Sequence, residues 1–453
     1  MDTSAQPGRS GPRGFRARET GARLRMSPPG RLAGRAAAVA IEQLHDPVRA
    51  LAVLLVVAFV LRVLWLNLPP HSLIFDEAYY VNAARVILGW SVPSGGHYAG
   101  SVAGLDPNSE HPPLGKLLIA ASMAIFGDNG IGWRLPSVIA AMVALWATYQ
   151  IVRATDRSAW LAVLVVALVA FDNLTLVHGR IGTLDILFLA PMLLGAWLAL
   201  TRRWLLAGVL VGIAMLIKLP AIYGVGAVVL YVLLTEGPGW WRARRIPLED
   251  VTGPIGVVLV AFAVALGGLG ILDARFTTFT SPFDHISRMI SYGTNLGAPA
   301  AAGFCPGADS HPWQWLFNEC QITYLRQAVD VRVGEKLIAT TVKVDFRGAM
   351  NPLLVGAIPL AGMFAAWYAF RTRNRLALWA IAWAAANYLP YLALAILTPR
   401  IMYIYYVLPL IPAVAIAIAL LLVRGGLPRP IRWGFLLAYL VGFVAYFPFR
   451  QIP

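Results

Sequence analysis

Long apolar runs recur along almost the whole chain, and they constrain its fold more than any other feature. Eleven of them are close to the length that crosses the hydrocarbon core of a bilayer. Because 58% of the 453 residues are hydrophobic and only 13% are charged, the sequence predicts an all-α polytopic membrane protein. The spans are predicted at residues 51–68, 134–152, 159–171, 184–200, 204–219, 221–234, 253–272, 352–370, 376–397, 401–423 and 432–449.

The intervening segments divide the chain into four parts. Residues 1–49 hold nine arginines and no sustained apolar period, which predicts a disordered basic tail. Residues 50–272 form a transmembrane module that includes a long loop at 69–133. A second long loop at 273–351 precedes the C-terminal transmembrane helices at 352–453.

Basic residues predict the orientation of the spans. With the tail in the cytoplasm, 22 of the 37 basic residues but only 8 of the 22 acids fall inside. The apolar segment 114–126 is too short to span, and counting it would move the basic turn at 153–157 outside, so we expect a surface or re-entrant helix there. Orientation and attraction to anionic lipid explain the pI near 10 without a nucleic-acid partner.

Both long loops therefore face outward, on the extracytoplasmic side of the cell membrane. Residues 283–293 form an amphipathic stretch that is predicted to lie on the membrane surface. Cys305 and Cys320 share this oxidising side, which allows a disulfide between them, with two free buried thiols as the alternative.

An adjacent carboxylate pair, Asp76 and Glu77, follows the first span. Acids at a membrane surface are costly to place for packing alone, so this pair is interpreted as catalytic. His111 and Lys116 lie in the motif HPPLGK, where two prolines fix the chain as it enters the short apolar helix. The alternative for this motif is a helix started by proline with a snorkelling lysine.

Further polar residues lie at the outer ends of later spans. GRIGTLD supplies Arg180 and Asp185, although such a pair at the end of a span, taken alone, is more often structural. Lys218 precedes a proline that breaks a helix and is a candidate for an anion site, but a snorkelling lysine explains it equally well. Arg400 and Tyr405 open a late span. For Tyr405, its neighbours Tyr403 and Tyr406, and His311, an interfacial aromatic belt is the favoured alternative.

The combination of acids and cations on one membrane face is more informative than any single residue. Sugar transfer from a polyprenyl phosphate needs a carboxylate that takes the proton from an attacking hydroxyl. It also needs cations that hold the departing phosphate, and an apolar groove for the isoprenoid. The sequence therefore favours such a transferase, with catalytic Asp76 and Glu77 and with donor contacts from His111, Lys116, Arg180, Asp185, Lys218, Arg400 and Tyr405.

These residues also carry a family resemblance. It is carried by the early Asp-Glu pair, by HPPLGK, by FGDNGIGWRLPS at 126–137, by the Arg followed five residues later by Asp, and by a late PWQW. With these motifs the chain resembles the protein O-mannosyltransferases of the GT-C superfamily over about residues 50–425. The resemblance implies eleven spans, a polyprenyl-phosphate mannose donor, and a Ser or Thr hydroxyl of a secreted protein as acceptor, with coupling to the secretion translocon as a further option. It implies that Asp76 occupies the position of the family's catalytic acidic residue and that Glu77 is the partner of this residue.

Two departures from the family pattern bear on the acceptor. The loop at 273–351 is too short for the β-trefoil domain of the eukaryotic enzymes, which implies a bacterial form, and Gly179 stands where a serine is usual before Arg180. A related enzyme that acts on a lipid, a glycan or a peptide natural product would keep the same donor machinery.

Two other classes of protein remain as alternatives. An anionic-solute transporter suits Lys218 and the proline-broken helices, but no two-half repeat is evident. The other alternative is a non-catalytic membrane scaffold, but such a protein would have no evident use for the exposed Asp-Glu pair. No Cys/His cluster has zinc-site spacing, so no structural zinc is expected, while a divalent cation at Asp76 stays an option because related oligosaccharide transferases use one.

Overall fold

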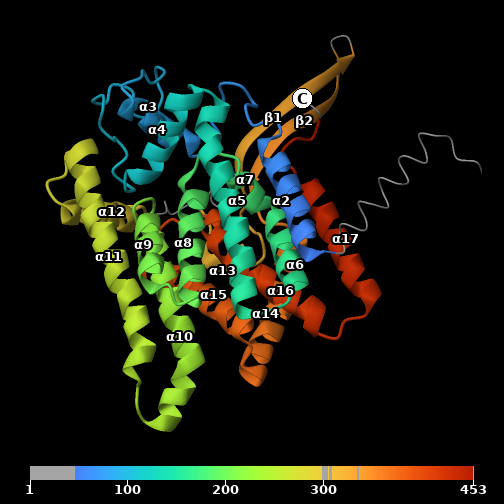
Figure 1. Ribbon diagram of the computed structural model, residues 1–453. Helices are drawn as coiled ribbons and strands as arrows, with labels where there is room; N and C mark the ends of the chain where they lie inside the picture. The colour runs from blue at the N-terminus through green and yellow to red at the C-terminus, as the bar shows by residue number, and fades with distance from the viewer. Residues whose placement is uncertain (1–45, 298–304, 306–308, 334–335, 452–453) are drawn as a thin grey trace, which may run out of the picture.

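The computed structural model describes residues 46–297, 305, 309–333 and 336–451. The predicted basic tail therefore lies almost wholly outside the described residues. Helices dominate the fold (Figure 1), and they span Pro47–Val63 (α2), Glu77–Ile87 (α3), Leu114–Phe126 (α4), Gly130–Thr155 (α5), Ala159–Ala170 (α6), Asn173–His178 (α7), Leu184–Leu200 (α8), Trp204–Met215 (α9), Ile222–Ala243 (α10), Leu248–Phe276 (α11), Pro282–Asn295 (α12), Pro312–Trp315 (α13), Pro352–Thr372 (α14), Arg375–Leu397 (α15), Ile411–Arg424 (α16) and Arg429–Ala445 (α17).

The predicted helical membrane fold is confirmed, and each predicted span coincides with a helix. Within the described residues, six helices are long and apolar enough to cross a membrane: Gly130–Thr155, Leu219–Ala243, Leu248–Phe276, Pro352–Thr372, Arg375–Leu397 and Ile404–Arg424. Other predicted spans correspond to shorter helices, so eleven crossings stay a prediction. The segment 114–126 is a helix of 13 residues, α4, and residues 283–293 lie within α12.

Local sequence explains where several of these helices begin. Asn129 caps α5 by accepting from the amides of Ile131 and Gly132, and Ser158 caps α6 through the amide of Leu161. Pro220 follows Lys218 where the chain leaves α9, and a short 3₁₀ turn at Leu219–Ala221 then leads into α10. These breaks bring polar side chains to the ends of otherwise apolar helices.

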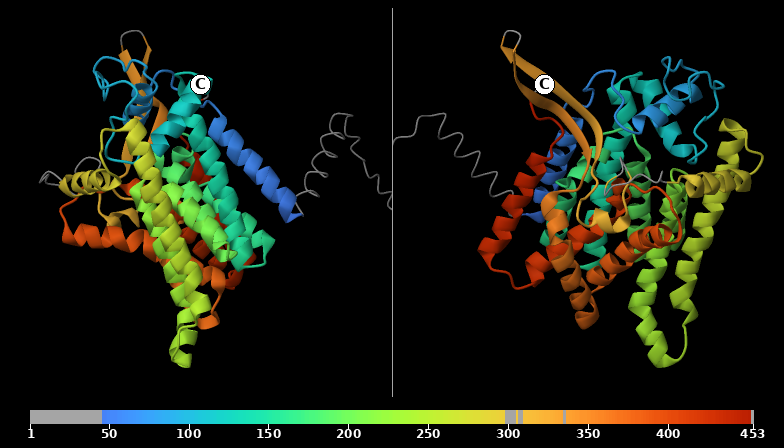
Figure 2. Two further views of the ribbon diagram at one scale, coloured as in Figure 1. Left: turned by 60° about the vertical axis from the view of Figure 1, so that its left-hand side comes forward. Right: turned by 180° about the vertical axis from the view of Figure 1, so that it is seen from behind.

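The helices are buried to very different degrees. The span from 404 to 424 is 83% buried in its most apolar stretch, whereas the corresponding stretch of α11 is only 17% buried. A helix that is apolar all round and yet exposed on most faces is suited to contact with lipid. The span from 404 to 424 therefore lies in the centre of the bundle. In contrast, α11 lies at the periphery, as Figure 2 shows.

A β-hairpin interrupts the helical pattern in the second long loop, residues 273–351. Strands β1 (Ile322–Val333) and β2 (Lys336–Gly348) pair antiparallel and project beyond the helices at the end of the bundle that holds α3 and α4 (Figures 1 and 2). The sequence interpretation expected juxtamembrane helices in this loop. It contains α12 and α13, but the hairpin was not predicted.

Candidate active site

Asp76 and Glu77 lie in the turn that leads from α2 into α3. Phe75, directly before them, has a φ of 55°, in the left-handed region that residues other than glycine rarely adopt. Asp76 is the N-cap residue of α3, but its side chain makes no capping hydrogen bond. The side chains of these two neighbouring residues have different surroundings.

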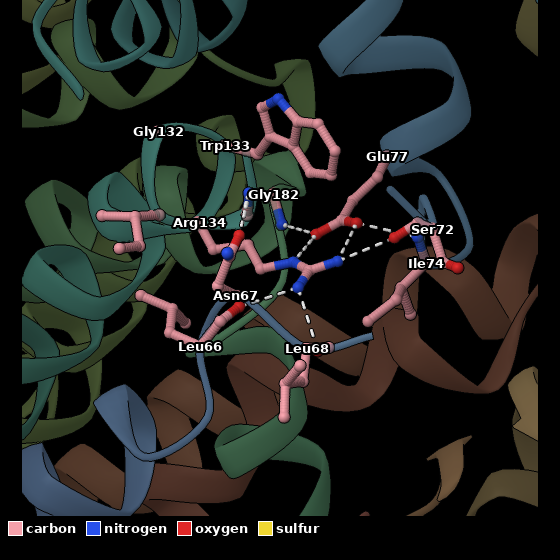
Figure 3. A network of polar contacts seen from close by, with 12 residues as sticks. Leu66, Asn67, Leu68, Ser72, Ile74, Glu77, Gly132, Trp133, Arg134 and Gly182 are labelled. Carbon is pink, nitrogen blue, oxygen red and sulfur yellow. Dashed lines mark hydrogen bonds and ion pairs between the residues drawn. The ribbon is translucent and has the colours of Figure 1, made fainter. Parts of the chain in front are cut away.

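Glu77 is fully buried and every part of its carboxylate is occupied (Figure 3). Its Oε1 accepts from Arg134 Nε at 2.8 Å and from the Gly182 amide at 2.7 Å. Its Oε2 accepts from Arg134 Nη2 at 3.0 Å and from the Ile74 amide at 2.7 Å. Arg134 also donates to the backbone carbonyls of Leu66, Leu68 and Ser72. Glu77 was predicted to be catalytic, but it orients the loop and has no oxygen left for a substrate hydroxyl.

Asp76 differs from Glu77 in having no hydrogen bond or ion pair to its side chain within the described residues. Burial raises its pKa from 3.8 to about 7, against the positive charge of Lys218, which lowers it. The charges of Asp185 and Glu110 contribute to the same increase in pKa. Asp76 is thus a carboxyl group whose pKa suits proton transfer near neutrality.

Asp185 and Lys218 form a buried ion pair near Asp76. Lys218 Nζ lies 2.7 Å from Asp185 Oδ1, and both side chains are about 95% buried. Asp185 lies in the first turn of α8, while Lys218 is held where the chain breaks before Pro220. Asp185 Oδ2 is buried without a hydrogen-bond partner, so the polar requirements of this pair are incompletely met.

Aromatic side chains from three parts of the chain surround this ion pair. Tyr324 of β1 stacks on Phe75 at 4.1 Å, and its hydroxyl lies 3.0 Å from His178 Nε2. Tyr405 packs against the edge of Phe75, and its ring centre is 5.3 Å from Lys218 Nζ. Tyr405 was predicted at the site and is placed there. Tyr324 and His178 were not predicted.

Arg400 brings a second cation to the site from the far end of the sequence. Its backbone bridges to Gly297, just beyond α12, and its guanidinium packs against Gly293. Its Nε is buried without a hydrogen-bond partner, and no carboxylate pairs with it in the described part of the chain. An arginine in this state can donate hydrogen bonds to two oxygens of a phosphate without first breaking an ion pair.

The motif HPPLGK has a different structure from the one expected. Lys116 is fully buried, and its Nζ contacts Asp106 Oδ2 at 2.6 Å, the carbonyls of Asn108 and His111 at 2.6 and 2.7 Å, and Asn108 Oδ1. Because an ammonium group has three hydrogens, no donor remains for a phosphate. Lys116 therefore holds the loop in place, which corrects the expectation of a donor contact.

Glu110 and His111, at the start of that motif, lie closer to the catalytic residues. Burial, together with the nearby cations Lys218, Lys116 and Arg400, holds the pKa of His111 well below its usual range, so His111 is neutral. Glu110 influences the pKa of Asp76, yet it was not predicted. The only signal was its position next to a proline motif, which is weak without a fold to bring it near Asp76.

Arg180 also departs from its predicted role. It is buried and donates from Nη1 to the Leu61 carbonyl at 3.1 Å and from Nη2 to the Leu64 carbonyl at 2.6 Å. It thereby satisfies carbonyl groups that the end of α2 leaves unpaired, and it lies over the ring of Phe449. The geometry places Arg180 in the scaffold around Glu77, away from the ion pair at Lys218, and does not support phosphate contact.

The remaining predicted residues lie in the second outer loop. Cys305 and Cys320 form a disulfide, so the two-thiol alternative is wrong. His311 stacks on Trp313 at 4.5 Å and precedes α13, which fits the packing role favoured for it. Among the described residues no group of three or more His, Cys, Asp or Glu side chains is placed to hold a metal ion, so we derive no step through a divalent cation.

Comparison with known proteins confirms the predicted family resemblance. Residues 110–266 match the family model described as dolichyl-phosphate-mannose-protein mannosyltransferase. A polyprenol-phosphate-mannose–protein mannosyltransferase of Corynebacterium glutamicum is 25% identical over 413 residues, which cover 77% of this chain and 76% of that protein.

Two solved structures share the fold. The Saccharomyces cerevisiae protein O-mannosyltransferase Pmt1-Pmt2 complex bound to the sugar donor matches with a TM-score of 0.61 at 11% identity, over 88% of this chain and 89% of that one. ArnT from Cupriavidus metallidurans bound to undecaprenyl phosphate matches with a TM-score of 0.53 at 20% identity, over 88% of this chain and 62% of that one. The chain therefore shares its fold with these two proteins.

Proposed function

We propose that this chain, a GT-C glycosyltransferase similar to the dolichyl-phosphate-mannose-protein mannosyltransferases, transfers mannose from a polyprenyl phosphate to Ser or Thr hydroxyls of secreted proteins. One observation carries the proposal. The carboxylate of Asp76 has no partner in the described structure and lies close enough to Lys218 to feel its charge, while both oxygens of the adjacent Glu77 are occupied.

The reaction is a single displacement with inversion at the anomeric carbon. Asp76 takes the proton of the acceptor hydroxyl as its oxygen attacks that carbon. The bond between the anomeric carbon and the phosphate oxygen breaks, and its electron pair stays with the phosphate. The products are the mannosylated acceptor, free polyprenyl phosphate and a protonated Asp76, which returns the proton to water.

Arg400 and Lys218 are the cations suited to the departing phosphate. The guanidinium of Arg400 has a buried Nε that lacks a partner, and Lys218 is shared with Asp185 rather than saturated by backbone carbonyls. Charge grows on the phosphate as the bond breaks, so preorganised cations stabilise the transition state more than the bound donor. His111, kept neutral, is available to donate one hydrogen bond to the donor.

Charge distribution supports a site on the extracytoplasmic face of the cell membrane. The turns with Arg153 and Arg202 and the C-terminal ends of α10 and α14 are basic. In contrast, the loop at 69–133 that holds Asp76 has more acids than bases, and the loop at 273–351 that holds the hairpin has equal numbers of the two. An acceptor polypeptide would meet the site on the side where secreted chains emerge, which makes coupling to the translocon a reasonable further proposal.

Incubation of membranes with labelled polyprenyl-phosphate mannose tests this function. We expect label in a Thr-containing peptide and release of polyprenyl phosphate, both abolished by Asp76→Asn. Solute flux through proteoliposomes without release of polyprenyl phosphate would instead support a transporter.

A second candidate is transfer to a lipid or glycan acceptor. The likeness to ArnT bound to undecaprenyl phosphate favours it, because the fold holds a polyprenyl phosphate there. In the same assay this alternative predicts label in lipid or glycan and none in peptide.

A further inference from the structure

The two ends of the β-hairpin have opposite environments. At its base, Ile322, Tyr324, Val344 and Phe346 are buried against the bundle. Farther out the hairpin extends beyond the helices (Figure 2), and Val329, Leu337 and Ile338 are 39%, 49% and 56% exposed. A long projecting ribbon with exposed apolar side chains invites pairing with another chain.

The two edges of the hairpin also differ. Near the base, the outer edge of β2 is covered by the C-terminal segment: Val344 bridges to Phe449, Asp345 N donates to the Pro448 carbonyl, and Arg450 N donates to the Lys343 carbonyl. The outer edge of β1 has no backbone hydrogen bond to any other described segment. Apart from Asp330, no other described segment therefore competes for the backbone groups along this edge.

The start of β1 lies next to the candidate site. Tyr324, near the start of the strand, stacks on Phe75, and Phe75 precedes Asp76 in the chain. Twelve residues of β1 span roughly 40 Å at about 3.3 Å per residue, so the strand connects the far tip of the hairpin with the site.

We propose that the outer edge of β1 binds an extended segment of the acceptor polypeptide by strand addition and guides it to Asp76. This inference rests on the proposed function, because a lipid or glycan acceptor has no backbone amides to pair with a strand. Hydrogen bonds to the backbone do not depend on side-chain identity, so the edge suits an enzyme that meets many unfolded sequences. Pairing along the strand raises the local concentration of hydroxyl groups at Asp76.

The acceptor fits this edge better than a second copy of the chain. Two hairpins paired edge to edge would bury β1 without using its approach to Asp76. An unfolded polypeptide could form hydrogen bonds with the backbone of β1 and also extend past Tyr324 toward Asp76.

A shortened hairpin tests the proposal. Residues 329–341 are replaced by an Asn-Gly turn between Ala328 and Val342, which are paired in the register, so the buried base and its contact with Phe449 remain. Binding of a fluorescent unstructured polypeptide of about 30 residues to the full-length protein in nanodiscs should weaken about tenfold. Sugar transfer to a Thr peptide of about six residues, too short to reach the removed strand, should change less than about twofold.

Two controls separate backbone pairing from other effects. Leu337→Ser with Ile338→Ser keeps the strand but removes exposed apolar side chains, and it should leave polypeptide binding nearly unchanged. A polypeptide with proline at alternate positions lacks every second amide donor and should bind the intact enzyme about as weakly as the normal polypeptide binds the shortened one.

Unchanged polypeptide binding by the shortened variant would overturn the proposal, as would a change from dimer to monomer with binding intact. Because binding is measured without donor, a failure of the proposed sugar transfer is recognised separately, by the absence of product from the wild-type enzyme with either acceptor.

Discussion

The polar network around Glu77 and the group of side chains around Asp76 begin at adjacent residues but are built in opposite ways. In the first, Glu77 and Arg134 satisfy one another and the surrounding backbone through short hydrogen bonds. In the second, Asp76 has no described partner, Asp185 retains a free oxygen and Arg400 retains a free nitrogen.

This contrast shows how one turn supplies both rigidity and reactivity. A saturated buried network fixes the position of its members, since any rearrangement leaves a polar group unpaired. An unsaturated group keeps donors and acceptors for a substrate, at a cost in stability that the neighbouring network offsets. The location of chemistry is therefore shown by missing partners more than by charge itself.

Removal of Arg134 should have the largest effect and should act on folding. Arg134→Met leaves Glu77 charged and buried without its main partner, which costs about 3–5 kcal/mol. We expect loss of monodisperse protein in detergent or a large drop in its unfolding temperature. Arg49→Met, which removes an exposed ion pair with Asp46 at 3.7 Å, is the control and should change stability by less than about 1 kcal/mol. Equal stability of the two variants would refute the scaffold role.

Replacement of Asp76 should reduce activity without reducing stability. Asp76→Asn keeps the size of the side chain but removes the proton acceptor, so kcat should fall by about 100-fold or more while donor binding persists. Asp284→Asn, on the exposed start of α12, is the matched control and should retain full activity. Near-normal turnover by Asp76→Asn would transfer the role of base to Glu110 or Asp185.

The phosphate site should respond to Arg400 and not to Arg180. Arg400→Lys keeps the charge but loses the planar fork, so kcat/KM for the donor should fall by about tenfold. Arg180→Lys should leave donor kinetics within about twofold and lower the unfolding temperature, because Arg180 holds the carbonyls at the end of α2. The reverse pattern would restore Arg180 to the phosphate site predicted from the sequence.

The sequence predicted the helical elements well because their signal is local. The apolar segment 114–126 coincides with α4. Asp76, Asp185, Lys218, Arg400 and Tyr405, which were predicted to share one site, lie close enough to act on one another or on the same neighbours. The β-hairpin was missed although its sequence carries a local signal, the β-branched residues of ITYLRQAVDVRV before Gly334.

Roles of individual cations were harder to predict, for a physical reason. Lys116, Arg180 and Arg400 look alike in the sequence, and only the fold shows which donors are already bound to carbonyls or carboxylates. Arg134 illustrates the same limit, since its partner Glu77 lies 57 residues away. Whether all donors of a side chain already have hydrogen-bond partners depends on three-dimensional packing. The charge and the spacing of residues in the sequence do not reveal it.

The pH dependence of activity should give the smallest effect and the most direct view of Asp76. The base acts only when deprotonated, and burial raises its pKa from 3.8 to about 7, so kcat/KM should rise about tenfold between pH 6 and pH 8 and then level off. Glu110→Gln removes a negative charge that raises the pKa of Asp76, so its profile should shift to lower pH with the same plateau. A profile that is flat above pH 5 would mean that Asp76 is already ionised at that pH. A shift of the Glu110→Gln profile to higher pH would show that Glu110 affects the site through something other than its charge.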